Sequence, residues 1–123
     1  MLQERAEFQI IGEASDGFEA VQKAEELQPD LILLDIGLPN LNGIEAARRI
    51  SAFAPGCRIL FLSENRCPTV VQEALHAGAC TRGYVMKSYA ADDLLAALEA
   101  VMENRLFVSS RIALLNFDKL PDA

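Results

Sequence analysis

Three short apolar runs that each end at a polar residue constrain the fold of this chain of 123 residues more than any other feature. The first run, Leu31–Leu34, ends at Asp35 and is followed at once by a loop that contains proline and glycine. The other two runs end at Ser63 and at Lys87. A short apolar run bounded by turn residues is typical of a strand buried on both faces. The three polar residues are therefore predicted to lie where buried strands end and the chain meets water.

Segments with helical periodicity separate these runs and predict the fold class. Residues 8–13 are predicted to form an opening strand, and Ala14-Ser15-Asp16-Gly17 supplies turn residues and a possible N-cap for the first helix. The third helix is predicted to close at Gly78 and the fourth to begin near Asp92. Strands that alternate with helices indicate an α/β fold, with a doubly wound parallel sheet covered by helices on both faces. Apolar residues recur at helical spacing over residues 18–27, 44–54, 70–75 and 94–102.

Composition limits the classes of protein to which the chain can belong. Hydrophobic residues make up 51% of the chain, which favours one domain with its own core. The net charge of −7 and the scattered basic residues predict no direct binding to nucleic acid. No apolar stretch approaches the roughly 20 residues of a membrane helix, and no signal-peptide pattern is evident, so we expect a cytoplasmic protein without membrane contact. The three cysteines form no CxxC pair and are predicted to be reduced thiols.

Parallel strands place their carboxyl ends at one edge of a sheet, so Asp35, Ser63 and Lys87 are predicted to converge there. A carboxylate can attack a phosphoryl group and form an aspartyl phosphate. A hydroxyl and an ammonium group can then bind the oxygens of the transferred group. Each residue also has a simpler interpretation: Asp35 as a helix or turn cap, Ser63 as a loop or cap residue, and Lys87 as a solvated charge. Their joint placement favours phosphoryl chemistry.

Several local motifs resemble the receiver domain of two-component response regulators, in particular the type joined to a helix-turn-helix output domain. The resemblance runs from about Phe8 to Met102. It implies a flavodoxin-like sheet of five strands in the order 2-1-3-4-5, and a role in phosphorelay signal transduction and transcription regulation. Its motifs are Gly12-Glu13-Ala14-Ser15-Asp16-Gly17, Asp35-Ile36-Gly37-Leu38-Pro39, Asn42-Gly43-Ile44-Glu45, Leu62-Ser63, Ala77-Gly78-Ala79 and Gly83-Tyr84-Val85-Met86-Lys87.

The resemblance implies a role for each residue of the site. Asp35 would be the phosphoacceptor, Ser63 the hydroxyl that contacts the phosphoryl group and Lys87 its ion partner. Tyr84 would be the aromatic switch that changes rotamer on activation, although a static packing role for its ring stays open. The backbone carbonyl of Gly37 would join Asp35 as a ligand of Mg²⁺. A histidine kinase or a phosphotransfer protein would be the partner that donates phosphate.

The chain departs from the family at its start. The family begins with an apolar strand that ends in a pair of acids, followed by a complete helix, and the residues ahead of Phe8 hold neither. We therefore expect a flavodoxin-like sheet that lacks its first strand and most of its first helix. Because Asp35 is the one evident carboxylate, Mg²⁺ is expected to bind weakly, and Glu13 is either a replacement ligand or a solvated loop acid. The open edge of Leu31–Leu34 predicts a homodimer by strand exchange, or direct pairing with the opening strand.

These expectations lead to competing hypotheses for function. Residues 1–107 are predicted to form an N-terminally truncated receiver domain, and residues 108–123 the start of a linker or C-terminal tail. The first hypothesis is a phosphoacceptor switch that controls a partner or output surface, and the alternative is a degenerate receiver that acts as an interaction module without phosphorylation. Neither is an enzyme, and an α/β enzyme is disfavoured because no glycine-rich phosphate loop and no base near Asp35 is evident. His76 is interpreted as a partly exposed helical residue rather than a phosphotransfer residue.

Overall fold

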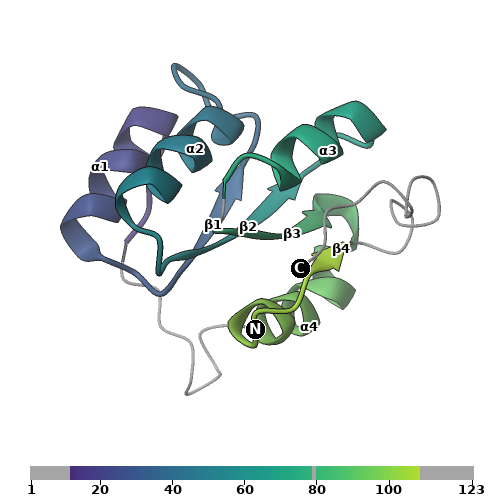
Figure 1. Ribbon diagram of the computed structural model, residues 1–123. Coiled ribbons are helices and arrows are strands. Elements are labelled where there is room, and N and C mark those ends of the chain that lie inside the picture. Colours follow the sequence, from purple (N-terminus) through teal and green to yellow (C-terminus); the bar gives the residue numbers. More distant parts are fainter. Residues whose placement is uncertain (1–11, 79, 109–123) are drawn as a thin grey trace.

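The computed structural model describes residues 12–78 and 80–108, in which helices and strands alternate (Figure 1). This succession confirms the predicted α/β class. The strands are β1 Leu31–Asp35, β2 Arg58–Ser63, β3 Thr81–Met86 and β4 Phe107–Val108. The helices are α1 Gly17–Leu27, α2 Gly43–Phe53, α3 Pro68–Leu75 and α4 Ala90–Met102, and a short 3-10 helix covers Lys87–Tyr89.

The strands form one parallel sheet in the order β1-β2-β3-β4. Asp35 of β1 pairs with Leu62 of β2, and Ser63 of β2 pairs with Met86 of β3. The carboxyl ends of these three strands therefore lie level at one edge. A parallel sheet with helical connections fits the flavodoxin-like fold, and β1, β2 and β3 follow the 3-4-5 part of the expected order.

Two strands differ from the expectation. Residues 8–11 of the predicted opening strand lie outside the described residues, and Gly12 and Glu13 belong to no strand. The sequence pattern does not predict β4, because a strand of two residues is too short to show an alternating pattern. β4 pairs with β3 through Phe107 and Val108. It lies at the boundary that the sequence places after residue 107.

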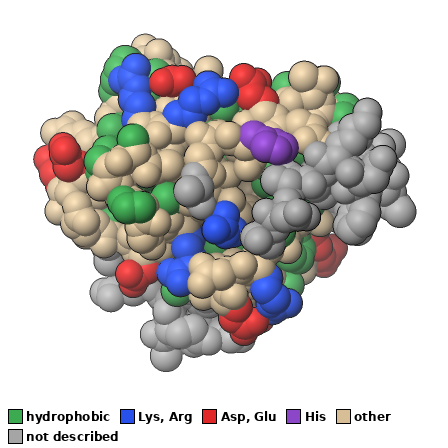
Figure 2. Space-filling model, viewed as in Figure 1, with side chains coloured by type: hydrophobic (Ala, Val, Ile, Leu, Met, Phe, Trp, Pro, Cys, Tyr) green, Lys and Arg blue, Asp and Glu red, His purple; other side chains and the backbone are tan. Residues whose placement is uncertain are grey.

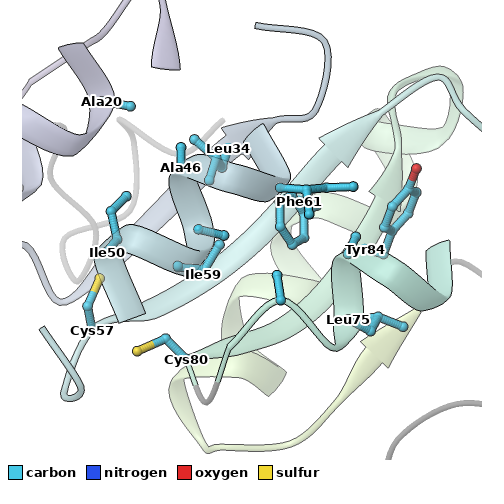
Figure 3. Close-up of a cluster of buried hydrophobic side chains, with 14 of the residues drawn as sticks. Ala20, Leu34, Ala46, Ile50, Cys57, Ile59, Phe61, Leu75, Cys80 and Tyr84 are labelled. Atoms are coloured by element: carbon cyan, nitrogen blue, oxygen red, sulfur yellow. The ribbon is translucent and has the colours of Figure 1, made fainter. Parts of the chain in front are cut away.

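Helices cover both faces of the sheet, as predicted (Figure 1). On one face α1, α2 and α3 pack over a core cluster that includes Ile50, Leu75 and Tyr84 (Figure 3). On the other face α4 packs over a second cluster that includes Leu60 and Leu98. Burial of an aliphatic or aromatic side chain stabilises a fold by about 1.5–3 kcal/mol. The two clusters together hold the sheet, and so its carboxyl edge, in one arrangement.

Side-chain caps determine where α1 and α2 begin. The Oδ1 atom of Asp16 accepts a hydrogen bond from the backbone N–H of Glu19 at 2.8 Å, and the Oδ1 atom of Asn42 accepts one from Glu45 at 2.9 Å. These bonds satisfy N–H groups that have no partner inside the helix. The N-cap of α1 thus lies within the stretch of residues 14–17 in which the sequence predicts one, and the structure identifies it as Asp16. α4 begins at Ala90, close to its predicted start.

α3 ends at Leu75, before its predicted end at Gly78. The N–H of Ala77 bonds the carbonyl of Ala74 at 3.1 Å, so the chain leaves the helix through a tighter turn. Gly78 packs against α2, where an added methyl group would lie 2.4 Å from the Oγ atom of Ser51. Close packing of the segment after α3 against α2, rather than helix termination, accounts for this glycine.

Candidate functional site

Three predicted site residues lie at the carboxyl edge of the sheet. Asp35 is the last residue of β1, Ser63 is the last residue of β2 and Lys87 directly follows β3. Because these strands are parallel and adjacent, one edge carries all three residues. Although the three residues share this edge, their side chains fall into two groups of contacts: Asp35 bonds Lys87, whereas Ser63 bonds Asn65.

Asp35 and Lys87 form an ion pair across the end of β2, with 2.5 Å between Nζ and Oδ2. The other carboxylate oxygen, Oδ1, accepts a hydrogen bond from the backbone N–H of Gly37 at 2.8 Å. Partial burial raises the pKa of Asp35, but the bonds from Lys87 and Gly37 outweigh it and hold the pKa below its ordinary value. Asp35 is therefore an ionised carboxylate at neutral pH, and 35% of its side chain is exposed. Such a group can act as a nucleophile.

A second group of contacts links Ser63 to Tyr84 through the backbone of Asn65. The Oγ atom of Ser63 accepts a hydrogen bond from the N–H of Asn65 at 3.0 Å, and the Tyr84 hydroxyl donates to the carbonyl of Asn65 at 2.8 Å. Both side chains are buried, and the ring centroid of Tyr84 lies 6.3 Å from that of Phe61 (Figure 3). Burial raises the pKa of Tyr84 despite a hydrogen bond with Ser63, and the negative charge of Asp35 raises it further. The buried Tyr84 hydroxyl therefore stays protonated at neutral pH and can donate to Asn65.

Of the four described strands, β1 alone ends in a carboxylate, that of Asp35. Among residues 12–78 and 80–108, His, Cys, Asp and Glu side chains form no group of three or more that could hold a metal ion. Mg²⁺ requires near-octahedral oxygen ligands, usually one or two carboxylates together with phosphate and water. Both oxygens of Asp35 already accept hydrogen bonds, and Gly37 presents its N–H group to that carboxylate. The described residues therefore do not fit a tight magnesium site.

Other candidates from the sequence have simple environments. His76 is exposed at the C-terminal end of α3, and Glu13 is exposed ahead of α1. The three cysteines are free thiols, and burial raises the pKa of Cys57 to about 11. The helices described between residues 12 and 108 are all too short or too polar to cross a lipid bilayer. Figure 2 shows Lys and Arg interspersed with Asp and Glu on the face viewed, rather than gathered in one basic patch.

Two parts of the site are not predictable from the sequence. Asn65 acts through its backbone N–H and carbonyl, which nearly every residue type has, so its identity carries no signal. The side chains of Asp16 and Asn40 are joined by a hydrogen bond of 3.0 Å, although they lie 24 positions apart. The cap at Asp16 has a sequence signature, whereas its contact with the loop after β1 has none.

Comparison of the sequence with known proteins gives one family. The profile of the response regulator receiver domain matches residues 1–99. The transcriptional regulatory protein LnrK of Bacillus subtilis (strain 168) is 38% identical over 101 residues, which cover 82% of this chain and 45% of that relative. The chemotaxis protein CheY of Listeria monocytogenes is 35% identical over 94 residues, which cover 76% of this chain and 77% of that relative.

Solved structures of the same kind share the fold. A two-component response regulator of the LuxR family from Aurantimonas sp. SI85-9A1 superposes with a TM-score of 0.83 at 33% identity, over 91% of this chain and 79% of that one. The response regulator domain of CheB from Thermotoga maritima superposes with a TM-score of 0.72 at 32% identity, over 83% of this chain and 82% of that one. The chain spans less than half the length of LnrK and of the transcriptional regulatory protein DegU of Brevibacillus brevis, 45% and 44% respectively.

Proposed function

The chain belongs to the response regulator receiver domain family, and we propose that it is a phosphoacceptor switch in which Asp35 accepts the phosphoryl group. Receiver domains are signalling modules of two-component systems rather than classical enzymes. A histidine kinase or a phosphotransfer protein donates the phosphate. Because several relatives are named as transcriptional regulators, the output is control of transcription through a changed surface around Tyr84.

The ion pair between Asp35 and Lys87 carries this proposal. One oxygen of Asp35 forms a bond to phosphorus with its lone pair, while the bond between phosphorus and the donor atom breaks. The leaving group departs with the electron pair of that bond. The lowered pKa keeps Asp35 ionised for the attack, and the ammonium group of Lys87 neutralises part of the negative charge that the phosphoryl group adds.

Ser63 and Tyr84 link the site to its surroundings. The Ser63 hydroxyl is placed at the end of the strand between Asp35 and Lys87, where it donates its proton to a phosphoryl oxygen after transfer. That donation competes with the hydrogen bond between Ser63 and Tyr84, while the Oγ atom can still accept from the N–H of Asn65. Phosphorylation therefore changes the hydrogen bonding of the Tyr84 hydroxyl, and a rotamer change of Tyr84 transmits it.

The same site limits metal binding. Receiver domains usually bind Mg²⁺ at an acidic site, and here Asp35 and the carbonyl of Gly37 are the expected ligands. The described residues hold no group of three or more His, Cys, Asp or Glu side chains that could bind the ion. Relative to a site with an acid pair, we expect affinity for Mg²⁺ to fall by more than the roughly 10–100-fold that follows loss of an outer-shell partner. Phosphorylation of this chain is accordingly slow.

A second candidate function is that of an interaction module that works without phosphorylation. The lack of any group of three or more possible metal ligands among the described residues favours it, because the charge of an aspartyl phosphate would then be neutralised mainly by Lys87. The fold and the surface near Tyr84 would then serve binding alone. The two candidates differ in whether Asp35 is modified.

Incubation of the full chain with Mg²⁺ and acetyl phosphate, followed by intact-mass spectrometry, tests the proposal. We expect slow addition of one phosphoryl group. The control is Asp35→Asn, which keeps the shape of the side chain but lacks the nucleophilic carboxylate. Addition to the wild type and not to the control supports the phosphoacceptor function. An unmodified wild type, or equal modification of both proteins, contradicts it, and an unmodified wild type favours the interaction module.

A further inference from the structure

The N-terminus of α1 forms hydrogen bonds and close backbone contacts with the turn that follows β1. The Nδ2 atom of Asn40 donates to Oδ2 of Asp16 at 3.0 Å, and the N–H of Gly17 donates to the carbonyl of Pro39 at 3.3 Å. A methyl group added at Gly17 would lie 1.8 Å from the carbonyl oxygen of Leu41, so the two backbones are in close contact. We refer to Asp16, Gly17, Pro39, Asn40 and Leu41 as the clamp.

The turn at residues 39–41 has a strained backbone conformation. Asn40 has a φ of 68°, in the left-handed region that L residues rarely adopt. The N–H of Leu41 bonds the carbonyl of Pro39 at 2.7 Å, which closes a three-residue turn. Turns of this kind with positive φ are rare and strained, and strained residues persist only where their surroundings hold them. The contacts from α1 supply that support.

The loop between β1 and α2, residues 36–42, also contacts Asp35. Its first residues carry the N–H of Gly37, which bonds the Asp35 carboxylate at 2.8 Å. Its last residue precedes Gly43, whose N–H bonds the carbonyl of Ile36 at 3.0 Å and whose Cα lies too close to the backbone of Asp35 for a side chain. Both ends of the segment are thus tied to the site, and the clamp holds its middle.

We propose that Asp16 and Asn40 are positioning residues for phosphorylation, because their hydrogen bond holds the loop that orients the carboxylate of Asp35. This inference rests on the proposed phosphoacceptor function of Asp35. It assigns Asp16 a second task beside its cap, since Oδ1 accepts from Glu19 while Oδ2 accepts from Asn40. A displacement of about 1 Å caused by a change away from the chemistry can slow a reaction on the order of a hundredfold.

The two tasks of Asp16 can be separated by substitution. Asp16→Asn keeps an oxygen for the α1 cap but presents an NH₂ group to Asn40, so the bond that Asn40 donates to a charged oxygen is lost, and only a weaker neutral bond can replace it. Asn40→Asp places two carboxylates against each other and loses the bond by repulsion. The double variant Asp16→Asn/Asn40→Asp restores one donor and one acceptor with the net charge unchanged. Asn42→Asp is the matched control, because it makes the same chemical change in the same loop at a local cap.

The rate of phosphorylation by acetyl phosphate with Mg²⁺ is the first measurement. We expect each single clamp variant to be slower by on the order of tenfold, the double variant to recover, and Asn42→Asp to match the wild type. Thermal unfolding is measured alongside. Slow phosphorylation in the single variants with recovery in the double variant supports the positioning role. Unchanged rates in both single variants, or a double variant that recovers unfolding temperature but not rate, overturn it.

The pKa of Asp35, measured by NMR of the carboxyl carbon, separates failure of this inference from failure of the proposed function. Loosening of the Gly37 contact raises that pKa, whereas loss of the negative charge at Asp16 would by itself lower it. We expect Asp16→Asn to raise it and the double variant to restore it. If the wild type is not phosphorylated, the proposed function fails while this measurement still decides the clamp. An unchanged or lowered pKa in Asp16→Asn overturns the clamp.

Discussion

At the scale of single residues, Lys87 controls the ionisation of Asp35. The carboxyl pKa lies below its ordinary value of 3.8 because the bonds from Lys87 and Gly37 outweigh partial burial. We expect Lys87→Gln to raise this pKa, as measured by NMR titration. A pKa that is lowered by folding stabilises the protein above the unfolded value, and this contribution is lost as the pH falls through the folded value. Wild type and variant should therefore differ in unfolding free energy at pH 7 and converge below about pH 4.

The size of this difference is limited by solvent. The side chains of Lys87 and Asp35 are 39% and 35% exposed, so screening reduces the stabilisation to about 0.2–1 kcal/mol. Arg105→Gln is the control, because it removes another short ion pair, that of Arg105 with Glu103 at 2.7 Å, which is far more exposed. An Asp35 pKa that responds no more to Lys87→Gln than to Arg105→Gln would show that the pair does not set the ionisation of the site.

At the scale of secondary structure elements, close contact between α1 and the loop after β1 makes Gly17 sensitive to substitution. A methyl group there would meet the backbone of Leu41, which cannot move without moving the loop. We expect Gly17→Ala to lower the free energy of unfolding by about 1–3 kcal/mol, as overpacking does. Denaturation in urea measures this change.

Gly56 is the matched control for the contact between Gly17 of α1 and the loop after β1. It has open space around its Cα and no positive φ. Gly56→Ala should leave stability unchanged or raise it by about 0.4–1 kcal/mol, because alanine reduces the freedom of the unfolded chain. If both substitutions had the same effect, the packing of α1 on the loop would not be a determinant of stability.

At the scale of the whole molecule, the edge of the sheet at β1 predicts self-association. Within the described residues β1 has β2 as its one neighbour. Its sequence Leu31–Leu34 carries no Lys, Pro or other residue that protects an edge strand. We expect a homodimer whose population rises with concentration, as measured by sedimentation velocity. Leu33→Lys should shift the equilibrium toward monomer, because a charge at an edge strand opposes pairing.

Leu95→Lys serves as the control for this surface. Leu33 and Leu95 are both 37% exposed, but Leu95 lies on α4 rather than on the edge strand. The same charge at Leu95 should leave the dimer in place. A wild type that is monomeric at every concentration, or equal loss of dimer in both variants, would contradict pairing through β1.

The sequence by itself determined the order of the elements and the position of the polar residues at strand ends. Runs such as Leu31–Leu34 identify buried strands, because burial on both faces of a parallel sheet selects apolar side chains at every position. The first helix is identified by its apolar stripe and its cap at Asp16. Local motifs around Asp35 and Lys87 identify the family, which the sequence and structure comparisons confirm.

Tertiary structure alone decided which of these residues touch. The ion pair of Asp35 with Lys87 joins positions 52 apart, and its geometry depends on the register of three strands. The role of Asn65 uses backbone atoms, and β4 is too short to show a period. The pairing of Asp16 with Asn40 requires α1 to lie against the loop after β1. Periodicity records which face of an element is buried, whereas contacts between distant segments depend on how whole elements pack, so no local pattern encodes them.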